Sequence, residues 1–177
     1  APLCSGAVIE SRAVANLDIP SHAVAVGVPA RVIRTSEPHV ADQQMPEVSL
    51  PTPEERFADW SYPEIEDGKP TKYHWIVRNL DGFRLGYKTD IGAYTFINAR
   101  RGVSVEDYAQ IGSHCSIYSV STIDGKEGPV HLKKNARVGS HSVVMPGVTI
   151  GESAIVGAFS MVTRDIPDHA IAYSVPA

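Results

Sequence analysis

An aliphatic residue recurs at every sixth position through much of the second half of the chain. The spacing holds without a slip from Val138 to Val162. The same spacing recurs earlier, at Ile91, Ile97, Ile111, Ile117 and Ile123. A period of six matches neither the period of two of a lone strand nor the 3.6 of a helix. It indicates a repeating path of short strand and turn, which predicts a parallel β-helix.

Glycine follows the leading aliphatic residue in several of these hexads, at Gly92, Gly112, Gly139, Gly151 and Gly157. We interpret each hexad as one flat face, whose leading side chain points inward while small residues let the chain bend around a corner. Three faces complete one triangular coil. Threading predicts which residues share a face: Ile111, Leu132 and Ile150; Ile117, Val138 and Val156; and Ile123, Val144 and Val162.

With these hexads, and with the closing phrase from Val162 to Ala177, the chain resembles the hexapeptide-repeat acyltransferases. The resemblance covers residues 85–177. It implies an all-β fold, a left-handed parallel β-helix of hexapeptide repeats, assembled as a homotrimer. The left hand is implied by the family alone, because parallel crossovers are otherwise right-handed. We expect the β-helix domain to span residues 73–177.

Residues 1–72 have a pattern different from that of the predicted β-helix domain. Residues 1–34 repeat the closing phrase, since Asp18-Ile-Pro-Ser-His-Ala matches Asp165-Ile-Pro-Asp-His-Ala, and we expect them to be the closing segment of a first, incomplete hexapeptide-repeat unit. A prism of one or two coils cannot bury its own ends. The segment therefore belongs either to a longer tandem transferase or to the end of a neighbouring prism.

The sequence of residues 35–72 predicts an extended linker with a short helix near 53–60.

Composition excludes several functions. A formal charge of −4 and a pI near 6.0 argue against a surface for nucleic acid. No apolar run approaches the ~20 residues that a membrane-spanning helix needs. The two cysteines, Cys4 and Cys115, provide neither a disulfide framework nor a CxxC metal site. We expect a cytoplasmic protein that binds neither nucleic acid nor membrane.

The hexads are interrupted twice, and the interruptions are where we expect a site. Ile97 and Val105 are eight residues apart, and Ile123 and Leu132 are nine apart, with a polar stretch that begins at Asp124 between the second pair. A loop that leaves a rigid scaffold commonly carries binding residues. The second interruption is the better candidate.

Acyl transfer needs a base for the acceptor, a donor for the oxyanion and a slot for the acyl carrier. Imidazole is the usual base. His131 lies at the mouth of the second loop and is the favoured base, with His114 and Asp124 as further catalytic candidates and Glu127 as another carboxylate. His114 and His141 occupy corners that can face a neighbouring subunit. The competing interpretation of each histidine is an exposed corner residue.

Around Cys115-Ser-Ile-Tyr-Ser-Val-Ser the chain is most similar to enzymes that acetylate the amino group of nucleotide-linked amino sugars. The resemblance implies acetyl-CoA as donor, a nucleotide sugar of surface glycan synthesis as acceptor, and no metal. Small residues can leave backbone groups open to the pantetheine arm of coenzyme A, as at Gly139, Ser140, Gly157 and Ala158. The candidates for its phosphates are Arg164, Lys133 and Lys134.

Three alternatives stay open. The first is a sugar O-acetyltransferase of the same fold. The second is a zinc carbonic anhydrase, in which three histidines would converge on the metal; that family has ligands spaced as His-x4-His, whereas His131 and His141 are ten apart. The third is a non-catalytic β-helix that serves as an assembly module and has no affinity for coenzyme A.

Overall fold

The chain forms two compact units, residues 1–56 and 57–177. The computed structural model describes most of the second unit and short stretches of the first. The described residues are 7–9, 18–19, 23–26, 31–35, 57–173 and 175–176.

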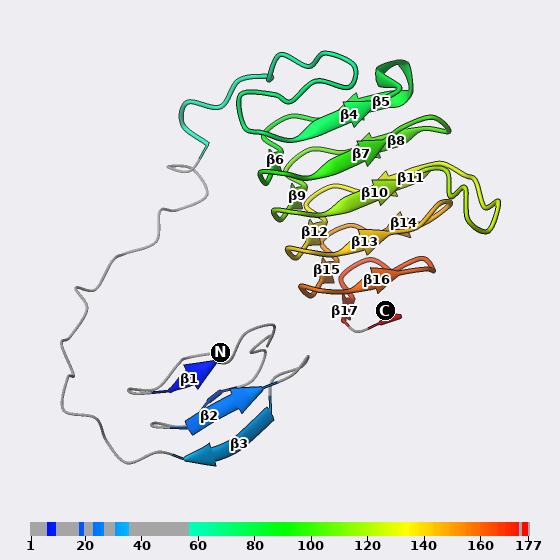
Figure 1. The fold of residues 1–177 in the computed structure, drawn as a ribbon. Coiled ribbons are helices and arrows are strands. Elements are labelled where there is room, and N and C mark those ends of the chain that lie inside the picture. Colours follow the sequence, from blue (N-terminus) through cyan, green and yellow to red (C-terminus); the bar gives the residue numbers. More distant parts are fainter. Residues whose placement is uncertain are drawn as a thin grey trace. The chain divides into compact units, whose positions relative to one another are not determined.

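The second unit is a parallel β-helix with three faces (Figure 1). Face 1 consists of β4 (Ile76–Arg78), β7 (Phe96–Asn98), β10 (Ser116–Tyr118), β13 (Val143–Val144) and β16 (Met161–Val162). Face 2 consists of β5 (Phe83–Leu85), β8 (Val103–Val105), β11 (Val130–Leu132) and β14 (Thr149–Ile150). Face 3 consists of β6 (Asp90–Ile91), β9 (Gln110–Ile111), β12 (Arg137–Val138), β15 (Ile155–Val156) and β17 (Ile171–Ala172).

Neighbouring strands of each face are parallel, so identical positions of successive hexads lie side by side. The leading residues of face 1 have no exposed surface: Val77, Ile97, Ile117, Val144 and Val162. Burying each such side chain contributes roughly 1.5–3 kcal/mol. The all-β architecture of stacked hexads predicted from the six-residue period is confirmed.

The threading of hexads onto faces is wrong in all three sets, because it does not hold across the loop between β10 and β11, although the residues after the loop are grouped correctly. Ile117 stacks on Val144 in face 1, and Val138 stacks on Ile111 in face 3. Ile123 leads no hexad, because its side chain is 98% exposed in the loop between β10 and β11. The chain leaves the prism after β10 and returns at β11, so no face forms between them. That loop projects from the stack of coils (Figure 1).

Corners require residues that tolerate a left-handed backbone or a close approach. The corner between faces 3 and 1 has positive φ at Tyr94, His114, His141 and Phe159, at 62°, 57°, 60° and 57°. Beside it, a Cβ atom on Gly139 would overlap the backbone nitrogen of Ala158 in the next coil. Glycine is therefore needed there for the coils to stack.

Residues 57–72, expected to end the linker, lie in the same compact unit as the β-helix. The Trp60 indole donates a hydrogen bond to the Thr89 carbonyl at 2.8 Å, and Trp75 is buried against Phe83. Of the helix predicted near 53–60, residues 57–60 form a turn, in which the Trp60 N–H donates to the Phe57 carbonyl, and the rest lies outside the described residues. A short 3₁₀ helix, η1, spans Leu80–Gly82.

In the first unit, β1 (Val8–Ile9) pairs in parallel with β2 (Ala23–Val26), and β2 pairs antiparallel with β3 (Arg31–Thr35). Ala25 is fully buried. That residues 1–34 are the closing segment of a hexapeptide-repeat unit stays a prediction. Most of the predicted linker, residues 36–56, lies outside the described residues.

Candidate functional site

His131 lies in the middle of face 2 with its side chain outward. Its neighbours in β11, Val130 and Leu132, are completely buried, whereas His131 itself is exposed. This alternation follows from the period of two in a strand. The parallel register places Ser104 of β8 on one side of His131 and Thr149 of β14 on the other.

The imidazole of His131 is held by one hydrogen bond. Ser104 Oγ lies 2.7 Å from His131 Nδ1, a short distance for such a pair. Among the described residues, Nε2 has no hydrogen-bond partner. This ring therefore presents Nε2 outward, where it can accept or give a proton.

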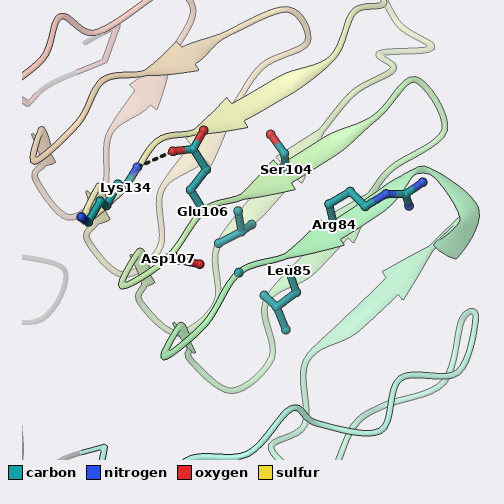
Figure 2. Close-up of a pocket in the computed structure, with 8 residues that line it drawn as sticks. Arg84, Leu85, Ser104, Glu106, Asp107 and Lys134 are labelled. Carbon is teal, nitrogen blue, oxygen red and sulfur yellow. Dashed lines mark hydrogen bonds between the residues drawn. The ribbon is translucent and has the colours of Figure 1, made fainter.

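A shallow depression of about 390 Å³ adjoins this pair on face 2. Figure 2 shows the side chains around it, with polar groups from three successive coils. The volume lies within the usual range of about 300–1,000 Å³ for small-molecule sites. Ser104 lines the depression and is also hydrogen-bonded to His131, so the imidazole lies next to the depression. The lining residues are Arg84, Leu85, Gly86, Ser104, Val105, Glu106, Asp107 and Lys134.

Two cations and two carboxylates surround this depression. Arg84 Nη1 donates to the carbonyls of Asp81 and Phe83, at 2.9 and 2.8 Å, which orients the guanidinium. Glu106 Oε2 accepts the backbone N–H of Lys134 at 2.9 Å (Figure 2). The lining can therefore offer positive charge to an anionic group of a ligand.

Sequence reasoning missed Ser104 and Arg84. The signal was available, because Ser104 directly precedes Val105 just as His131 directly precedes Leu132. Stacking the two hexads on one face predicts the contact. The threading placed Leu132 on another face, so this neighbour relation was not seen.

His114 lies elsewhere on the prism, at the corner between faces 3 and 1. Its ring stacks on His141 with centroids 4.7 Å apart and planes 10° apart, and His141 stacks on Phe159 at the same centroid distance. Tyr94 continues the column on the other side of His114. The corner position predicted for both histidines is confirmed. Within one chain, the structure does not bring His114 to His131.

Asp124 lies near the tip of the loop between β10 and β11. The loop is a hairpin, closed where the Gly128 N–H donates to the Ser119 carbonyl at 3.0 Å. Hydrogen bonds from Ser121 first, and then from Lys126, hold the pKa of Asp124 below its usual range. A carboxylate with a lowered pKa is a weaker base, so this environment favours a positioning role over proton abstraction.

Glu127, the other loop carboxylate, is paired with Arg101. Both of its oxygens accept hydrogen bonds from the Arg101 guanidinium, at 2.8 and 3.0 Å. This pair lowers the pKa of Glu127. The contact fastens the hairpin to the preceding coil, at the corner between β7 and β8.

The glycines proposed to contact coenzyme A already use their backbone groups within the prism. Gly139 N–H donates to Val156 and Gly157 N–H to Ala172, both at 2.8 Å. The Gly139 carbonyl accepts from the buried thiol of Cys115. Coil stacking accounts for these glycines, while Ser140 and Ala158 beside them stay predicted coenzyme contacts.

The predicted phosphate ligands lie at other corners. Lys133 Nζ is 3.1 Å from Asp168 Oδ1 at the corner between faces 2 and 3. Hydrogen bonds from the Glu152 backbone N–H and from Lys133 lower the pKa of Asp168. Arg164 is exposed just after β16, at the corner between faces 1 and 2. The predicted coenzyme residues thus occupy three corners of one prism.

Within the described part of the chain, no group of three or more His, Cys, Asp or Glu residues is arranged to hold a metal ion. His131 lies on face 2, whereas His141 lies at the corner between faces 3 and 1, so the two are on different parts of the prism. The helices of the described residues include none that is long and apolar enough to cross a bilayer.

Residues 129–164, which contain His131, match the family described as bacterial transferase hexapeptide (six repeats). A dTDP-3-amino-3,6-dideoxy-α-D-galactopyranose 3-N-acetyltransferase from Aneurinibacillus thermoaerophilus is 56% identical over 50 residues, which are 28% of this chain and 26% of the relative. A serine acetyltransferase from Synechococcus elongatus is 30% identical over 126 residues, 68% of this chain and 52% of the relative.

The fold is similar to that of a hexapeptide-repeat acetyltransferase from Vibrio cholerae solved with acetyl-coenzyme A. The TM-score is 0.54 at 22% identity, covering 56% of this chain and 60% of the other. The resemblance to hexapeptide-repeat transferases predicted from the hexads is confirmed. The chain spans about a quarter of the length of the first curated relatives that it matches.

Proposed function

We propose that the protein is an acyl-CoA-dependent acetyltransferase that acts on the amino group of a nucleotide-linked amino sugar used in surface glycan synthesis. The observation that carries the proposal is the match of residues 129–164 to bacterial transferase hexapeptides. Acetyl-CoA supplies the acyl group in this reaction. The matched segment includes His131, whose exposed imidazole adjoins a depression with charged rims.

The amine acceptor is supported by two observations. The relative from Aneurinibacillus thermoaerophilus is an amino-sugar N-acetyltransferase. The two loop carboxylates, Asp124 and Glu127, have lowered pKa values and are engaged within the loop and with Arg101. An amine that is partly neutral at pH 7 needs less help from a base than a hydroxyl does.

The chain's own residues then have distinct roles. His131 Nε2 takes the proton that the acceptor nitrogen loses as it attacks the thioester carbonyl, and it can return that proton to the departing thiolate. Arg84 and Lys134 offer positive charge to the diphosphate of a nucleotide sugar. His114 would act only in a site that includes a second copy, because it lies at another corner.

We further propose a homotrimer. The predicted coenzyme residues lie at three corners, so one coenzyme could contact several of them only in a groove between copies. One row of outward positions on face 1 also forms a partly exposed stripe that is mostly apolar, which favours association, whereas the other row has Arg78, Asn98 and Tyr118. The stripe consists of Ile76, Phe96, Val143 and Met161, with Ser116 between them. A cytoplasmic location stays a prediction from the sequence.

Acetylation of a hydroxyl is the second candidate, because the serine acetyltransferase relative aligns over 68% of the chain. The two candidates separate in one experiment. Purified protein is titrated with acetyl-CoA by calorimetry, and thiol release is then measured with nucleotide-linked amino sugars and with the matching hydroxy sugars. Release with an amino sugar alone supports the proposal, whereas release with the hydroxy sugars moves the assignment to O-acetylation.

The base is tested in the same assay. His131→Ala should lower turnover ~10²-fold or more, since a positioned base contributes that much. His169→Ala, at an exposed corner of another coil, is the matched control. If His131→Ala keeps its activity while Asp124→Asn loses it, the loop carboxylate is the base. Absence of heat with acetyl-CoA would overturn the proposed transferase activity. Bound zinc would then support the carbonic anhydrase, and absence of zinc would support an assembly role.

A further inference from the structure

We infer that Ser104 is a positioning residue for His131, accepting the Nδ1–H of the imidazole and leaving Nε2 as the unprotonated, outward nitrogen. The 2.7 Å contact between Ser104 Oγ and His131 Nδ1 carries the inference. The inferred tautomer rests on the proposed function, because the direction of this bond is argued from the role of His131 as a base, but the tautomer can be measured without any measurement of turnover.

The contact is fixed by the fold. Ser104 and His131 are direct partners in the parallel pair β8 and β11. The residues before and after them are also partners, Val103 with Val130 and Val105 with Leu132, and all four are buried. The backbone around this pair therefore has little freedom, and the serine has a single χ angle to set.

The proposed role of His131 as a base indicates which atom donates in this hydrogen bond. A histidine that takes a proton at Nε2 becomes an imidazolium, in which both ring nitrogens are donors. An accepting Ser104 oxygen keeps its bond to Nδ1 before and after this transfer, and the bond becomes charge-assisted afterwards. A donating Ser104 hydroxyl would lose the bond when the ring is protonated, and it would place the neutral ring's proton on Nε2.

Ser104 is also the residue through which His131 adjoins the depression. It lines the depression between Arg84 of the preceding coil and Lys134 of the following one. A ligand seated there lies beside Ser104 and hence beside His131. The choice of tautomer then decides whether the nitrogen that faces outward can receive the ligand's proton.

Thr149 provides a matched control. It adjoins His131 from the other side in the same register, but among the described residues it makes no hydrogen bond to the ring. Its backbone N–H donates instead to Asp165 Oδ1 at 2.7 Å. Replacing its hydroxyl changes polarity next to His131 without touching Nδ1.

The test reads the tautomer directly, from the position of the proton on the imidazole ring. Two-bond proton–nitrogen NMR spectra of the ¹⁵N-labelled full chain are recorded at a pH where His131 is neutral. We expect the Nδ1–H form in the wild type, in Ser104→Thr and in Thr149→Val, and a shift towards Nε2–H in Ser104→Ala. The same tautomer in the wild type and Ser104→Ala, or Nε2–H in the wild type, would overturn the inference.

Kinetics then separates this inference from the proposed function. Ser104→Ala should lower kcat about tenfold, less than His131→Ala, with the KM for acetyl-CoA unchanged and with rescue by Ser104→Thr. If His131→Ala loses turnover while Ser104→Ala keeps it, the positioning role is wrong and the proposed base stands. If His131→Ala keeps turnover, the base is wrong, and the spectra still decide the tautomer.

Discussion

Val144 illustrates how tightly a leading residue of a hexad is enclosed. It stacks between Ile117 and Val162, and none of the three has exposed surface. An aspartate there would place an unpaired carboxylate among aliphatic groups. Such a charge costs about 3 kcal/mol or more, a large share of the usual ~5–15 kcal/mol of stability.

We therefore expect Val144→Asp to unfold the prism, as measured by circular dichroism and thermal melting. The matched control is Ile155→Asp, an aliphatic position in β15 that points outward and is 38% exposed. It should melt close to the wild type. A cooperative melt of Val144→Asp near the wild-type temperature would contradict a closed interior at this position.

Cys115 belongs to a buried column that ties successive coils together. Its thiol lies 3.3 Å from the Gly139 carbonyl, just as the Thr95 and Ser142 hydroxyls donate to the carbonyls of Gly112 and Gly157. Burial raises the pKa of the Cys115 thiol, so little thiolate is available for reaction.

In a Cys4→Ser background, we expect Cys115 to resist a disulfide reagent at neutral pH and to react fully in denaturant. Because the folded-state pKa is raised, increasing the pH to the ordinary range of a thiol should still give slow labelling. Reagent uptake is followed by absorbance, with the denatured protein as the control. Rapid labelling of the folded protein would show that this coil opens.

At the scale of elements, the hairpin between β10 and β11 shows where the six-residue period stops being informative. Ile123 lies six residues after Ile117, yet it is 98% exposed. The period describes only the spacing of residues along the chain, whereas the hairpin is closed by a hydrogen bond from the Gly128 N–H to the Ser119 carbonyl, which that spacing does not predict. The three-faced coils could thus be predicted from sequence, and the assignment of faces beyond the loop could not.

The same limit applies to the site. His131 was predicted beside the loop, because its place just before the leading Leu132 follows from the hexad. Its contact with Ser104 joins residues 27 positions apart, and it depends on which coil stacks on which. The pairing of Arg101 with Glu127 likewise depends on the path of the loop. Position along a face could be predicted, but contacts between residues before and after the loop depend on how the coils stack across it.

The Arg101–Glu127 pair should control the mobility of the hairpin more than the stability of the protein, because both side chains are about half exposed. We expect Glu127→Gln to speed amide hydrogen exchange in residues 120–127 while thermal melting is almost unchanged. High salt should act in the same direction on the wild type. Glu66→Gln, which removes an exposed ion pair with Lys69, is the control and should leave the hairpin unaffected.

The pair also predicts a pH dependence. The folded-state pKa of Glu127 is lowered, so its contribution is complete above the ordinary titration range of a glutamate and is lost as the pH falls through the lowered folded value. Hairpin protection should therefore decrease only in acid in the wild type. Glu127→Gln should show a smaller loss in acid, which Asp124 accounts for because its pKa is also lowered. Equal acid sensitivity in both proteins would mean that another group closes the hairpin.

At the scale of the molecule, the outward faces differ in character, and this difference leads to a test of assembly. Face 1 has the apolar stripe among its outward positions, whereas the outward side of face 2 has Arg84, Ser104, His131 and Thr149. A face that carries a candidate site must stay accessible to a ligand. An apolar face is better covered, since removing apolar surface from water contributes about 25 cal/mol per Å². Face 1 is therefore the better surface for contact between copies.

We expect the native mass, measured by sedimentation equilibrium, to equal three chains. Phe96→Asp, in the centre of the apolar stripe, should yield a folded single chain, because a charge at a covered face opposes association. Gln110→Asp, on the outward side of face 3, should still form the trimer. If coenzyme contacts come from more than one copy, the dissociated Phe96→Asp protein should also lose its heat of binding to acetyl-CoA. Undiminished binding by that single chain would place the whole coenzyme site on one prism and remove the need for His114 of a second copy.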